Sequence, residues 1–290
     1  MDSEPLMPSF VELPLQTRIY YLDTCVWSDL TESDVAQAGS LSYFQSSGRA
    51  VALSHFSLLE LSRASKIFPG SDSLFSRLRQ QIYIPFLYDQ VIESELKSFP
   101  KTWRMRWFPL SLLIDESNPR VLQALANNPH FVKSREELYQ FGLDHFMSLE
   151  QLKENFIPLH GDEYTVEDAS YFAWGAMVDY LERHFPNFLK SNRRFIRKRG
   201  VDSLDSLLFL RIRFLFLFFK YYLHGQSPRI SDFLDLAHVS YAPYCSVFVT
   251  ERNVCNVLNR IKSNGLMLSD TEILHVSDFL AKMSKASNPV

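Results

Sequence analysis

The 290-residue sequence predicts an α/β fold in which a mostly parallel central sheet is flanked by helices. Short segments rich in β-branched and aromatic residues alternate with longer segments whose apolar residues recur at helical spacing. Strands that are separated by helices usually pair in parallel through right-handed crossovers. The hydrophobic content of 46% is sufficient to build a substantial core on such a sheet.

Three predicted strands and a helix lie in the first third of the chain. The segment Arg18–Leu22, RIYYL, is short, β-branched and aromatic, which is typical of a buried strand. Residues 50–53 predict a second strand after a glycine turn. Residues 54–66 have helical spacing, with Ser54 as the expected N-cap. Residues 82–87 predict a third strand.

The middle of the sequence is mostly helical, and it separates two parts that carry the strand signals. A discontinuous core is therefore expected from residues 1–95 and 226–290, with residues 96–225 as a helical insertion or subdomain. Within the C-terminal part, residues 231–240 predict a helix and residues 246–250, SVFVT, predict the last strand.

Composition excludes several classes of protein. A formal net charge of −3 argues against a wholly basic nucleic-acid coat protein, so polyanion binding requires local features. Cys25, Cys245 and Cys255 lack zinc-site spacing and are too few for a disulfide framework. The N-terminal residues have no signal-peptide pattern. The apolar segment 204–223 contains four charged residues and predicts a buried helix, so no membrane partner is expected. The cysteine content and the N-terminal residues together predict a cytoplasmic protein.

Five acidic residues are expected near one edge of the predicted sheet. Asp23 follows the first strand and Glu251 follows the last, while Glu60 lies on the helix after the second strand. Asp232 and Asp235 are three residues apart and share one face of the helix before the last strand. Ligands of open parallel sheets bind outside the carboxyl ends of the strands, so these side chains are expected to converge.

Carboxylates that share a small volume repel one another, and bound cations relieve this repulsion. An all-oxygen set of ligands suits Mg²⁺ or Mn²⁺, and such ions support hydrolysis of phosphodiester bonds. Each acid taken alone also fits a structural role. Asp23 could cap a helix, Glu60 could lie on a solvated helix face, and Asp232 suits the start of a helix.

Three segments together resemble the motifs of PIN-domain nucleases, in the larger bacterial form with a helical insertion. YYLDTCVWSDL is similar to the first motif, and LSHFSLLELSR is similar to the second. SDFLDLAHVSYAPYCSVFVTERN is similar to the third and fourth. The resemblance implies a PIN-like domain in which Asp23, Glu60 and Asp235 hold the metal, with Asp232 competing for the third place.

The resemblance also implies a function, namely a metal-dependent endoribonuclease of toxin or RNA-processing type. RNA is favoured over DNA as the substrate. Asp23, Glu60, Asp235 and Glu251 are the expected catalytic residues. The family pattern has an acid where Ser246 stands and an aspartate after Thr250, where this chain has Glu251. The alternative is therefore a catalytically weak PIN-like module that binds RNA or a protein partner. A cognate inhibitor protein and a homodimer are left open.

Residues beside the acids and one distant cluster are candidates for substrate binding. His238 lies three residues after Asp235 and could bond an acid or the scissile phosphate, or be a buried structural histidine. A run of cations around residue 195 could neutralise several phosphates, or simply be a solvated helix end. The expected substrate-binding residues are Thr24, His238, Thr250, Arg252, Arg193, Arg194, Arg197 and Lys198.

Overall fold

The computed structural model describes residues 10–32, 34–46, 48–63, 68–112, 157–159, 163–229 and 231–287. Much of the predicted insertion, including residues 113–156, and the end of the predicted helix 54–66 lie outside these residues. The described part of the chain forms one six-stranded sheet in the order β4-β3-β2-β1-β5-β6. The strands are β1 (Arg18–Leu22), β2 (Arg49–Ala52), β3 (Ile82–Pro85), β4 (Trp107–Pro109), β5 (Val247–Thr250) and β6 (Glu272–His275).

All neighbouring strands pair in parallel except the edge pair β3 and β4. The predicted α/β class with a mostly parallel sheet is therefore confirmed. β1 lies at the centre, between β2 and β5. A strand from the N-terminal part of the chain and one from the C-terminal part thus pair in the middle of the sheet, with Tyr20 opposite Val247 and Leu22 opposite Val249.

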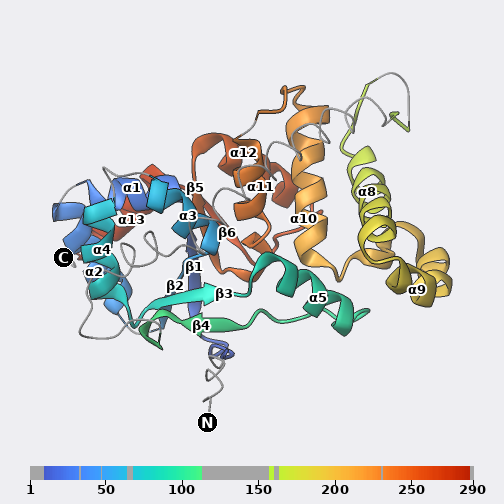
Figure 1. Cartoon of the computed structure of the whole chain (residues 1–290). Helices are drawn as coiled ribbons and strands as arrows, with labels where there is room; N and C mark the ends of the chain where they lie inside the picture. The colour runs from blue at the N-terminus through green and yellow to red at the C-terminus, as the bar shows by residue number, and fades with distance from the viewer. Residues whose placement is uncertain are drawn as a thin grey trace, which may run out of the picture.

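Helices cover both faces of the sheet, as Figure 1 shows. The α-helices are α1 (Thr24–Thr31), α2 (Asp34–Gln45), α3 (His55–Arg63), α4 (Phe68–Leu78), α5 (Tyr88–Ser98), α8 (Asp168–His184), α9 (Pro186–Arg199), α10 (Leu208–Leu217), α11 (Asp232–Val239), α12 (Arg252–Ser263) and α13 (Val276–Ser287). Short 3₁₀ turns are η1 (Leu110–Leu112), η2 (Gly200–Leu204) and η4 (Ala242–Tyr244), and a π-helical turn is η3 (Phe218–Leu223).

The alternation of side chains along β1 divides the core into two layers. Tyr20 and Tyr21 are both fully buried, but successive residues of a strand point to opposite faces. Tyr20 packs in the cluster that includes residues of α1, α2, α4 and α13. Tyr21 packs in the larger cluster, which includes residues of α5, α8, α10, α11 and α12 and the stacked ring of Phe248.

Two strands were not predicted from the sequence. β4 is only three residues long and lies within a span expected to be helical. It forms because Trp107 pairs with Pro85 of β3 and bridges Val11. β6 pairs with β5 along Glu272–His275, and its four residues are too few for a distinct periodicity.

The apolar segment 204–223 is buried, as expected, but it is not one regular helix. It contains the end of η2, then α10, and then the π-helical turn η3, whose Phe218 and Phe219 are fully buried. Within the part of the chain that the structure describes, no helix combines the length and the apolar character needed to cross a membrane.

Candidate metal centre

Asp23 lies at the carboxyl end of β1, where the strand meets the first helix. Its backbone is extended (φ −64°, ψ 161°), and it is the N-cap of α1. One carboxylate oxygen, Oδ1, accepts a hydrogen bond from the Thr24 amide at 2.6 Å. The other, Oδ2, accepts one from the Thr250 hydroxyl at 2.6 Å, at the end of the neighbouring strand β5. These two bonds fix the orientation of the carboxylate of a residue that is 7% exposed.

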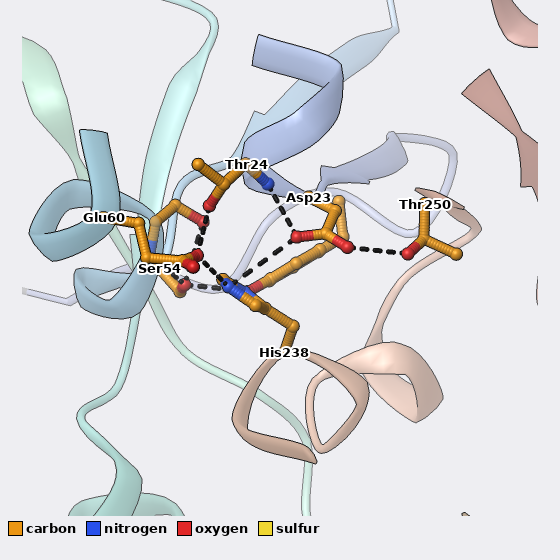
Figure 2. A network of polar contacts seen from close by, with 8 residues as sticks. Asp23, Thr24, Ser54, Glu60, His238 and Thr250 are labelled. Carbon is orange, nitrogen blue, oxygen red and sulfur yellow. Dashed lines mark hydrogen bonds and ion pairs between the residues drawn. The ribbon is translucent and has the colours of Figure 1, made fainter. Parts of the chain in front are cut away.

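Two further side chains converge on Asp23 from different helices, as Figure 2 shows. Glu60 of α3 accepts a hydrogen bond from the Thr24 hydroxyl, and its Oε2 lies 2.6 Å from Nε2 of His238 on α11. The same nitrogen lies 3.7 Å from Oδ1 of Asp23. One ligand atom from each of Asp23, Glu60 and His238 lies within 4.8 Å of the other two. Such a set of atoms could hold a metal ion.

The inner side of the His238 ring is fixed by hydroxyl groups. Nδ1 lies 2.6 Å from the Tyr21 hydroxyl, which donates a hydrogen bond to Oγ of Ser54 at 2.7 Å. Since that hydroxyl proton is directed to Ser54, the Tyr21 oxygen accepts from Nδ1–H. With Nε2 facing carboxylates, the arrangement fits a doubly protonated imidazolium.

The electrostatics of the cluster agree with a charged histidine. Burial by itself lowers the pKa of His238, but the charges of Asp23 and Glu60 outweigh burial and raise this pKa to about 9. The adjacent His55 behaves in the opposite way, because burial, followed by the charge of His238, lowers its pKa to about 4. His238 therefore neutralises part of the charge of Asp23 and Glu60 in the metal-free protein.

The other two expected metal ligands bind an ammonium group instead. Lys220 of η3 is 3% exposed, and its Nζ lies 2.8 Å from Asp232 and 2.9 Å from Asp235. Asp232 also accepts hydrogen bonds from the Tyr221 hydroxyl at 2.7 Å and the Arg229 amide at 2.8 Å. It thus holds the start of α11 in place. Lys220 was not expected as the partner of these carboxylates. The signal that could have indicated it is a charged residue within a strongly apolar segment.

Asp235 remains close enough to the cluster to be affected by its charge. Burial raises the pKa of Asp235 to about 6 although Lys220 acts to lower it, and the charges of Asp23 and Glu251 add to the rise. Its side chain is 23% exposed. Asp235 is therefore beside the three converging ligands rather than among them.

The remaining candidates fall into three groups. Thr24 and Thr250 bond directly to the cluster, whereas Glu251 and Arg252 are exposed at the start of α12, directly after Thr250. The four cations expected to bind substrate lie on α9, which Figure 1 places beyond α8 and α10, at the far end from α1 and α2. The structure does not bring Arg193, Arg194, Arg197 and Lys198 to the cluster.

The donor set narrows the choice of ion. Carboxylate oxygens suit Mg²⁺ and Mn²⁺, and an imidazole nitrogen adds preference for a transition metal. The Glu60 side chain is 24% exposed and that of Asp23 is 10% exposed, so solvent reaches the cluster mainly at Glu60. If His238 is to be a ligand as well, its Nε2 proton must leave when the ion binds.

Comparison with known proteins gives no independent assignment. Neither a protein-family model, nor a curated protein, nor a solved structure matches this sequence.

Proposed function

We propose that this chain is a divalent-metal-dependent nuclease with a PIN-like domain, which hydrolyses phosphodiester bonds at the cluster of Asp23, Glu60 and His238. The proposal is supported by the convergence of these three side chains, whose ligand atoms lie within 4.8 Å of one another. They meet at the carboxyl ends of β1 and β5, where open parallel sheets bind their ligands. The motif resemblance of the same segments to PIN-domain nucleases supports the same conclusion.

Each residue of the cluster has a distinct role in this proposal. Asp23 and Glu60 hold Mg²⁺ or Mn²⁺, and His238 is either a third ligand or a cationic contact for the scissile phosphate. Thr24 and Thr250 orient the two carboxylates through the hydrogen bonds described above. The bound ion supplies polarisation of a phosphoryl oxygen and activation of a water molecule.

The substrate in this proposal is RNA, because the toxin-type members of the resembled family cleave RNA. Glu251 and Arg252 are exposed at the start of α12, directly after Thr250. An RNA strand that leaves the cluster past Thr250 would meet these two side chains first. Glu251 acts there as a positioning group for water or metal, and Arg252 as a phosphate contact.

The test is cleavage of labelled single-stranded RNA and DNA with Mn²⁺, Mg²⁺ or EDTA, comparing the wild type with Asp23→Asn and Glu60→Gln. Loss of even an outer-shell partner of a metal commonly costs about 10- to 100-fold, so each variant should lose at least about 100-fold in rate. Asp34→Asn, at an exposed aspartate on α2, is the matched control and should keep full activity. Cleavage that persists in EDTA or in Asp23→Asn would contradict the proposal.

One observation favours a second candidate, a PIN-like module that binds RNA or a protein partner with little cleavage. Lys220 neutralises Asp232 and Asp235, so fewer carboxylates remain to hold a metal than the motif resemblance implies. Calorimetric titration with Mn²⁺ separates the two candidates. The nuclease requires saturable binding that Asp23→Asn weakens, whereas RNA binding without Mn²⁺ binding would favour the second candidate.

A further inference from the structure

Helix α9 concentrates positive charge in a chain that has no excess of it. Its 14 residues contain no acidic side chain. The whole chain has 30 Lys and Arg against 33 Asp and Glu, so this concentration is local. The cationic side chains of α9 are all exposed, and they are Lys190, Arg193, Arg194, Arg197, Lys198 and Arg199.

Four of these cations form one stripe along the helix. Lys190, Arg193, Arg194 and Arg197 are spaced i, i+3, i+4 and i+7, which places them on the same face. At 1.5 Å per residue the stripe is about 10 Å long. Three of its members are arginines, and one planar guanidinium group can donate two parallel hydrogen bonds to the oxygens of one phosphate. The stripe therefore matches several successive phosphates of one strand.

The opposite face of α9 is already covered by the protein. Phe188 and Phe195 pack edge-on against Phe99, with ring centroids 5.1 and 5.3 Å apart. Ile196 is 7% exposed, and Leu189 packs against the same core cluster. An amphipathic helix that lies in a membrane surface needs a free apolar face, and α9 does not have one. The cationic face is the part left for a partner.

We propose that the cationic face of α9 binds the phosphate backbone of a single-stranded nucleic acid, at a place separate from the candidate metal centre. Figure 1 shows α9 at the end of the molecule beyond α8 and α10, whereas the metal centre lies at the ends of β1 and β5. This inference rests on the proposed nuclease function and narrows its substrate to a single-stranded polymer. A strand that contacts both places is a polymer, which excludes mononucleotides and dinucleotides as the preferred substrate.

The experiment measures binding apart from cleavage. Fluorescence anisotropy of a labelled 30-nucleotide RNA, and of the DNA of the same sequence, is recorded in EDTA with the Asp23→Asn protein over a series of salt concentrations. The test protein adds Arg193→Gln, Arg194→Gln and Arg197→Gln. The matched control instead adds three charge removals at exposed sites outside α9, Arg77→Gln, Lys101→Gln and Lys285→Gln.

Each phosphate contact on a single strand contributes about 0.7 to the slope of log K against log salt. Loss of three contacts should make the slope shallower by about 2 and weaken binding on the order of 100-fold at 0.1 M salt. The control should bind like its parent. Comparison of the RNA and DNA arms identifies the sugar that is preferred.

Equal slopes for the α9 variant and the control would overturn the inference. If the α9 variant loses binding to vesicles of anionic lipid while its nucleic-acid binding is unchanged, the inference is overturned in favour of a membrane surface. Since binding is measured without cleavage, the two proposals fail separately. If the wild type cleaves in a metal-dependent way but the α9 variant binds nucleic acid normally, the proposed nuclease function is retained and the α9 site is rejected.

Discussion

Replacement of Lys220 by Met is the sharpest test of how the acidic region is stabilised. The Lys220 side chain is 3% exposed, and its ammonium group contacts Asp232, whose side chain is 4% exposed, and Asp235. Methionine keeps most of the apolar stem but removes the positive charge. Two carboxylates then share a buried volume without their cation, and among the described residues Asp232 keeps its bonds to the Tyr221 hydroxyl and the Arg229 amide.

The expected cost follows from the burial of the pair. Removal of one partner from a buried ion pair typically destabilises a protein by about 3–5 kcal/mol, because the remaining charge is uncompensated. For a chain of this size, each kcal/mol lowers Tm by about 2–4 °C, so Tm should fall by roughly 10 °C. The loss should be larger at pH 8 than at pH 5, since acid protonates Asp235 and removes its uncompensated charge. Burial already raises the pKa of Asp235 to about 6.

The assays are urea denaturation and thermal unfolding, each followed by circular dichroism at both pH values. Lys97→Met is the matched control, because Lys97 also pairs with a carboxylate, Glu93, but its side chain is 77% exposed. An exposed i, i+4 pair contributes about 0.3–0.5 kcal/mol. A loss below about 1 kcal/mol for Lys220→Met, or the same loss at pH 5 and pH 8, would refute this reasoning.

Three further outcomes are expected. Burial raises the pKa of Glu95 to about 8, so the contribution of this residue to stability is complete below pH 4.5 and falls by about 1.4 kcal/mol per pH unit towards pH 8. The free energy of unfolding of Glu95→Gln, measured by urea denaturation, should not show this fall. Thr250→Val removes the hydrogen bond to Asp23 and should weaken Mn²⁺ binding about 10- to 100-fold by calorimetry, without unfolding the chain. Phe248→Ala, at a fully buried ring stacked on Tyr21, should cost about 3–5 kcal/mol in urea denaturation, and a cost under 1 kcal/mol would contradict the packing described for it.

The central strands could be predicted because their signals are local. RIYYL and SVFVT are β-branched or aromatic and end beside residues that break the strand. The position of Asp23 follows from this, since an aspartate directly after a buried strand and before a helix serves as an N-cap. Edge strands β4 and β6 depend on pairing with β3 and β5, which short local segments do not encode.

The composition of the metal centre was only partly predictable, because it depends on contacts between distant residues. Asp23 and Glu60 were expected and do converge. His238 was expected to contact an acid or a phosphate, but its bond to Glu60 joins residues 178 positions apart. The pairing of Lys220 with Asp232 and Asp235 depends on how η3 packs against α11, and helical spacing within one segment gives no information about that packing.

The position of Ser246 bears on whether the site is weakened relative to the motif resemblance. Ser246 precedes β5, where its amide donates to the Ile19 carbonyl at 2.9 Å and its hydroxyl accepts from the Ile19 amide at 3.2 Å. It is therefore level with the start of β1, not with Asp23. Thr250 lies four positions further along the strand, or about 13 Å at 3.3 Å per residue.

An acid at position 246 would thus lie near the amino ends of β1 and β5 and could not reach a metal held by Asp23 and Glu60 at their carboxyl ends. Serine suits this position, because its hydroxyl accepts a hydrogen bond from the Ile19 amide. Ser246 precedes β5, so this side chain takes the place of a backbone acceptor from that strand. The lack of an acid at 246 consequently gives no reason to expect a weak metal centre. The departures that remain are Glu251 in place of an aspartate and the pairing of Lys220 with Asp235, and release of Asp235 in the Lys220→Met protein is expected to tighten Mn²⁺ binding.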